Sequence, residues 1–266
     1  MKHIVFFHAL LIAIGGWAQT NPNFNADFDG DDCVGLVDLL GVLSVFGTCT
    51  NWECGHDVLY LGHSYGTVEI GEQCWFAENL RSTEFRDGTP IPQLQSEQDW
   101  VNAESPGWCF YENENGLEMS DFGMLYNFYV VGNNMCPVGW RVPNFGEWFD
   151  SGLREWMIEN FPDLGMESAG LLRSVAPYEW NVSNDGATDV LGFHGRPSGG
   201  RRVDGSFIAS SVEARFHINN TFGGGWAQFV FLRNENNTFD RSGPDADFNT
   251  ETWLHGSAIR CLKETE

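Results

Sequence analysis

Four aspartates near the N-terminus have the spacing of a calcium-binding loop. Counted from Asp27, carboxylates fall at positions 1, 3, 5 and 12, on Asp27, Asp29, Asp31 and Asp38. The backbone carbonyl of Cys33 adds an oxygen at position 7. Calcium takes six to eight hard oxygen ligands in loops of this kind, so the sequence predicts a calcium site at these five residues.

The spacing of leucines and valines after this loop, up to Phe46, predicts a short apolar helix that ends at Gly47. The loop resembles that of dockerin repeats, which use Asp at the last position. Dockerins carry two such repeats and this chain shows one, so the resemblance does not extend to cohesin binding. We expect residues 21–50 to form a calcium-stiffened spacer; the alternative is a solvated acidic turn that caps a helix.

Seven cysteines could form disulfides if the chain is exported. Spacing does not determine connectivity, and an odd number leaves one thiol over. The pairs that we expect are Cys33 with Cys49, Cys54 with Cys74, and Cys136 with Cys261, which leaves Cys109.

The first 18 residues have the pattern of a secretory signal peptide. Lys2 and His3 are followed by an apolar run over 4–14, then by glycines and small residues that end at Ala18. The run is too short for a membrane anchor, and no later apolar run has spanning length. The sequence therefore predicts a secreted or surface-attached protein that begins at Gln19 after cleavage.

Composition narrows the fold and the partners. The chain has 37 acidic and 14 basic residues, a net charge of −23, which disfavours nucleic acid as a partner because phosphate binding needs clustered Lys and Arg. Its 31 glycines and 14% aromatic residues indicate a loop-rich domain with short strands and a sizeable core.

Local patterns predict the elements of the main domain, residues 54–264. The alternation of apolar and polar residues over 58–70 predicts a hairpin. Asn144 with Glu147 three residues on predicts the capped start of a helix over 144–160. Four tryptophans flanked by Gly and Pro are expected in the core: Trp75, Trp108, Trp140 and Trp148.

Four blocks in this domain resemble the Fibrobacter succinogenes major paralogous domain family. They are QCWFAENL at 73–80, GMLYNFY at 123–129, CPVGWRVP at 136–143 and IRC at 259–261. The resemblance implies a secreted protein of the Bacteroidetes and Fibrobacter type, without an established activity. It also implies an α+β fold similar to C-type lectins, with long loops. The chain departs from the family at 210–216, so no ligand surface is carried over there.

Residues for catalysis do not form a known motif. The sequence has no nucleophile elbow, His-Glu-x-x-His helix or phosphate loop, and each histidine is expected to be exposed or locally bonded. Residues 179–185 are expected to form a polar loop; the alternative is a calcium and sugar site. Arg196, Arg201 and Arg202 are expected to pair internally.

These observations favour a non-catalytic binding or adhesion module, secreted or on the cell surface, with an unknown ligand that is a carbohydrate or a surface protein. One alternative is an enzyme of the formylglycine-generating type, which shares a related fold and would use Cys109 as a reactive thiol. A second alternative is a structural component of the cell surface.

Overall fold

The computed structural model describes residues 52–113, 122–132, 134–150, 152–175, 180, 184–219, 228–234, 237, 239–241 and 253–265. From residue 53 onward they belong to one unit, Glu53–Glu266. The predicted signal peptide, the calcium loop of Asp27, Asp29, Asp31, Cys33 and Asp38, and the pair Cys33–Cys49 lie outside the described residues.

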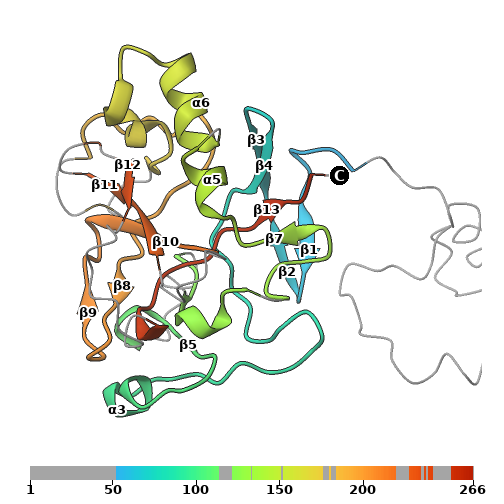
Figure 1. The fold of residues 1–266 in the computed structure, drawn as a ribbon, viewed down its shortest axis with the longest axis vertical. Helices are drawn as coiled ribbons and strands as arrows, with labels where there is room; N and C mark the ends of the chain where they lie inside the picture. The colour runs from blue at the N-terminus through green and yellow to red at the C-terminus, as the bar shows by residue number, and fades with distance from the viewer. Residues whose placement is uncertain are drawn as a thin grey trace, which may run out of the picture. The chain divides into compact units, whose positions relative to one another are not determined.

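Two antiparallel sheets form the centre of the domain (Figure 1). The first has the order β3-β4-β13-β7, with β3 at Thr67–Ile70, β4 at Gln73–Phe76, β13 at Leu262–Lys263 and β7 at Trp140–Arg141. The second has the order β10-β11-β12, at Glu213–Ile218, Gln228–Arg233 and Phe239–Arg241. Because β13 near the C-terminus lies between β4 and β7, the first sheet joins distant parts of the sequence.

Three short hairpin-like pairs lie outside these sheets in the described residues. They are β1 (Val58–Tyr60) with β2 (His63–Tyr65), β5 (Trp108–Cys109) with β6 (Leu125–Tyr126), and β8 (Gly200–Arg201) with β9 (Phe207–Ile208).

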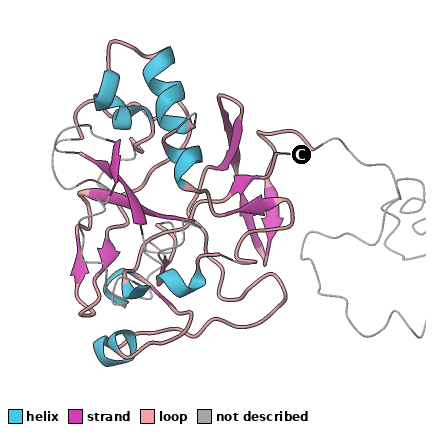
Figure 2. Ribbon diagram, viewed as in Figure 1, coloured by secondary structure: helices cyan, strands magenta, loops and turns pink. Residues whose placement is uncertain are grey.

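Among the described residues the helices are few and short, and long loops join the elements (Figure 2). They are α3 (Glu97–Val101), α5 (Phe145–Trp148) and α6 (Leu153–Asn160), with 3-10 turns η1 (Tyr111–Asn113), η2 (Phe128–Val130) and η3 (Gly165–Leu171). This mixture is compatible with the predicted α+β class. No helix in the described ranges has the length and apolar character needed to cross a membrane.

The predicted hairpin and helix are both present, with different limits. The hairpin is β1–β2, and Thr67 already begins the next hairpin, β3–β4. The capping box between Asn144 and Glu147 is confirmed, but the helix breaks between α5 and α6. The cause is a close return of the chain: a Cβ on Gly152 would lie 2.0 Å from the carbonyl oxygen of Glu147, so only glycine fits there.

Packed aromatic rings fill the space between the two sheets. Trp148 of α5 lies 4.6 Å from the Trp75 ring of β4 and 5.6 Å from the Phe216 ring of β10, measured between ring centroids. All four tryptophans predicted for the core are buried. Such aromatic pairs add about 0.5–1.5 kcal/mol each to the burial of their surface.

Two of the expected disulfides are present. Cys54 bonds to Cys74, and Cys136 bonds to Cys261 across 125 residues of sequence. Cys109 is free and buried, as expected from the pairing. The second disulfide therefore ties the middle of the chain to its C-terminal strand.

Candidate functional site

A groove lies between the turn of the β3–β4 hairpin and helix α6, which stand next to each other in Figure 1. Its volume is about 780 Å³. The turn contributes one wall and the helix the other, through Glu69, Ile70, Gly71, Glu72, Gln73, Gly152, Glu155, Trp156 and Glu159.

Helix α6 divides its residues between the core and the groove. Leu153 and Met157 are fully buried in the core, and Trp156, one position from Met157, lines the groove and is half-buried. The turn comes close to this indole, because a Cβ on Gly71 would lie 2.7 Å from its Cδ1 atom. Gly71 also has φ +64°, a conformation that glycine adopts without strain.

The groove presents hydrogen-bond acceptors and an aromatic surface. Four glutamates line it, and no Lys or Arg is among the described residues that line it. Gln73 donates its side-chain N–H to the carbonyl of Glu147 at 3.1 Å, while its own amide oxygen is buried without a hydrogen-bond partner among the described residues. Such a lining suits a cation or a ligand rich in hydroxyl groups.

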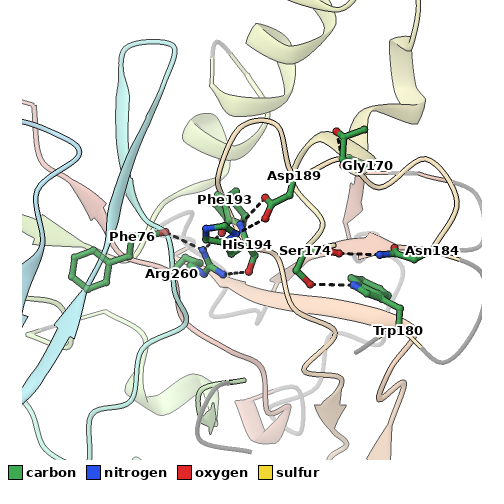
Figure 3. Close-up of polar contacts among 10 residues, drawn as sticks. Phe76, Gly170, Ser174, Trp180, Asn184, Asp189, Phe193, His194 and Arg260 are labelled. Atoms are coloured by element: carbon green, nitrogen blue, oxygen red, sulfur yellow. Dashed lines mark hydrogen bonds and ion pairs between the residues drawn. The ribbon is translucent and has the colours of Figure 1, made fainter. Parts of the chain in front are cut away.

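The loop at 184–195 holds an Asp–His pair (Figure 3). Asp189, almost fully buried, accepts hydrogen bonds from the backbone N–H of His194 and from its ring Nδ1. Both residues have positive φ, 47° and 50°. The hydroxyl of Ser174 contacts the indole N–H of Trp180 at 3.3 Å, so this serine is not held against His194 as a nucleophile would be.

The predicted polar loop at 179–185 is described only at Trp180, Asn184 and Asp185. Asn184 donates to the carbonyl of Ser174 at 2.9 Å, and the Asp185 carbonyl accepts from Arg173 at 2.8 Å. Trp180 is buried. These contacts attach the described part of the loop to residues of the domain interior.

Arg260 is fully buried at the centre of this region (Figure 3). Its guanidinium donates to the carbonyls of Phe76 and His194 at 2.9 Å each, to the carbonyl of Phe193, and to the Asn79 side-chain oxygen at 2.6 Å. Burial lowers the pKa of Arg260 to about 9, so the group is still charged at neutral pH. Its hydrogen bonds to described residues all go to uncharged oxygens.

Two further arginines repeat this arrangement. We use the term carbonyl hub for each of the three residues, Arg173, Arg201 and Arg260. Arg201 donates to the carbonyls of Leu94, Gln95, Ser96 and Gly205. Arg173 donates to the carbonyls of Asp185 and Arg233 and to the Asn237 side chain. The expected internal pairing of Arg201 is therefore correct, but its partners are backbone oxygens rather than carboxylates.

Cys109 lacks the setting of a reactive thiol. It is buried beside Trp100 and Leu125, and burial raises the pKa of the thiol to about 11 although Arg201 lies near it. A nucleophilic cysteine needs a thiolate at neutral pH, so this geometry does not supply the reactive group that the formylglycine-generating alternative requires.

His217 contradicts the expectation of exposed or locally bonded histidines. It is fully buried on β10, and its Nε2 contacts the carbonyl oxygen of Tyr126, 91 residues away, at 2.7 Å. Burial, with Arg215 nearby, lowers the pKa of His217 to about 3 and that of His255 to about 4. Because β10 is buried on both faces from Ala214 to Ile218, it lacks the alternation of apolar and polar residues that marks a half-buried strand, so the sequence offers no signal for the burial of this histidine.

No group of three or more His, Cys, Asp or Glu side chains within the described ranges is arranged to hold a metal ion. The predicted calcium loop, outside those ranges, stays a prediction.

Comparison with known proteins identifies the family of this domain. The model of the Fibrobacter succinogenes major domain matches residues 68–263. Apart from Thr67, the first residue of β3, that span contains both sheets, the groove and the three carbonyl hubs. None of the curated proteins and none of the solved structures compared with the chain matches it. The chain belongs to the Fibrobacter succinogenes major domain family.

Proposed function

We propose that this protein is a secreted, non-catalytic binding or adhesion module with a C-type-lectin-like fold, and that its ligand is a carbohydrate or a surface protein. The groove carries this proposal, because it combines a volume of about 780 Å³ with a half-buried indole and a set of polar acceptors. Pockets with an aromatic surface and a few convergent polar groups are the usual places where proteins bind ligands.

The scaffold around the groove supports a binding role. Three carbonyl hubs and two disulfides fix long loops without regular secondary structure, and a rigid surface loses little entropy when it binds. The disulfides are also compatible with an oxidising compartment outside the cytoplasm, in agreement with the proposed signal peptide.

For the N-terminal segment we propose calcium binding by Asp27, Asp29, Asp31, Cys33 and Asp38. The role of the ion there is structural: it stiffens the spacer that precedes the domain. The spacing of the carboxylates supports this assignment.

The experiment is binding of the protein from Gln19 onward to a panel of immobilised polysaccharides and purified surface proteins, in calcium and in chelator. Saturable binding to one class, weakened by Trp156→Ala, supports the proposal. Failure to bind any member of the panel, with the fold verified by circular dichroism, would contradict it. Loss of binding only in chelator would link the calcium loop to the function.

A further inference from the structure

We infer that the groove between the β3–β4 turn and α6 accepts an arginine or lysine side chain from a basic segment of a protein partner. This inference rests on the proposed binding function and selects one of its two ligand classes.

Charge is the first argument. Glu69 and Glu72 come from the turn and Glu155 and Glu159 from the helix, so carboxylates stand on both walls of one groove. Like charges on facing walls repel one another, and a cation placed between them is attracted to both walls at once. A neutral sugar would gain none of this energy.

One uncharged feature of the groove also favours a cation. The half-buried indole of Trp156 offers a π surface, on which cations bind favourably. The domain uses this chemistry internally, because the guanidinium carbon of Arg201 lies 4.6 Å from the ring centroid of Trp100.

A second copy of this chain is a poor occupant. The chain carries 14 basic against 37 acidic residues, so two copies repel each other at neutral pH. Charge complementarity therefore assigns the groove to a different, basic protein.

The test uses two peptides that differ in charge alone: acetyl-(Gly-Arg)₃-amide, and the same peptide with citrulline, a neutral isostere, in place of arginine. Each is titrated into the ¹⁵N-labelled protein, and the indole N–H signal of Trp156, assigned with Trp156→Phe, is followed. We expect the arginine peptide to shift this signal and the citrulline peptide to leave it unchanged.

Variants then distinguish binding of the arginine peptide at the groove from its general attraction to an acidic protein. Glu72→Gln/Glu159→Gln removes two exposed carboxylates from the groove, and Glu53→Gln/Glu104→Gln removes two exposed carboxylates elsewhere. The groove variant should bind the arginine peptide about tenfold more weakly, which corresponds to about 1.4 kcal/mol, and the control less than about twofold more weakly.

Three results would overturn the inference: equal binding of both peptides, equal weakening by both double variants, or no shift of the Trp156 signal. If the arginine peptide does not bind while a polysaccharide of the panel binds and shifts that signal, the groove is a sugar site and the proposed binding function stands. If the peptide, the polysaccharides and the surface proteins all show no binding, the proposed function is contradicted as well.

Discussion

The two buried histidines make the stability of the domain depend on pH. In the folded protein the pKa values of His217 and His255 are lowered to about 3 and about 4, chiefly by burial, whereas an unfolded chain gives histidine a pKa of about 6.5. Below pH 6.5 the unfolded state therefore binds more protons than the folded state, and the free energy of unfolding falls as the pH falls toward 4.

The size of this effect follows from the pKa difference. Each pKa unit corresponds to about 1.4 kcal/mol, and pH 5 lies about 1.5 units below the unfolded value. Each histidine therefore removes about 2 kcal/mol of stability between pH 7.5 and pH 5, and the pair about 4 kcal/mol. That is a large part of the 5–15 kcal/mol that is typical of a folded domain.

Urea unfolding at both pH values, followed by tryptophan fluorescence, measures the effect. His217→Gln keeps an N–H donor for the Tyr126 carbonyl but does not titrate, and His255→Gln is its counterpart. We expect the double variant to lose about 4 kcal/mol less than the parent between pH 7.5 and pH 5. His56→Gln, at an exposed position, is the control and should follow the parent. A double variant whose stability falls as steeply as that of the parent would refute the reasoning.

Three further predictions concern the scaffold. Arg260→Met should destabilise the domain by about 4 kcal/mol or more, since several buried oxygens lose their donor at about 1–3 kcal/mol each; urea unfolding measures this, and a loss below about 1 kcal/mol would show that the hub is dispensable. Cys136→Ala/Cys261→Ala should cost about 4–5 kcal/mol and Cys54→Ala/Cys74→Ala about 3 kcal/mol, because the first pair closes the longer loop; the reverse order in thermal unfolding would argue against the loop-closure explanation. Cys109, with its pKa raised to about 11 by burial, should react with Ellman's reagent at pH 7.5 only after denaturation, and fast labelling of the native protein would contradict its buried, protonated state.

Features that depend on local sequence could be predicted. The capping box of Asn144 and Glu147 needs only a three-residue spacing, and the β1–β2 hairpin only a glycine turn between alternating residues. The burial of the tryptophans follows from their size. The family blocks located the domain, although they carried no information on a binding site.

The groove and the hubs were not predictable in this way. The two walls of the groove are about 80 residues apart in sequence, and neither wall has a known ligand-binding motif. The hub arginines bond to backbone carbonyls, which every residue type possesses, so no partner residue marks them. The break before Gly152 depends on the close return of the chain to the Glu147 carbonyl, a local backbone geometry that no residue pattern marks.

The hubs also bear on how the surface of this domain can change. Arg201 holds three consecutive carbonyls at 94–96 whatever side chains those positions carry. Substitutions on the outside of such a loop therefore leave its anchor intact. A domain built in this way can diversify its exterior through point mutations while its backbone path is inherited, and the same property makes the loops suitable places for randomised libraries in protein engineering.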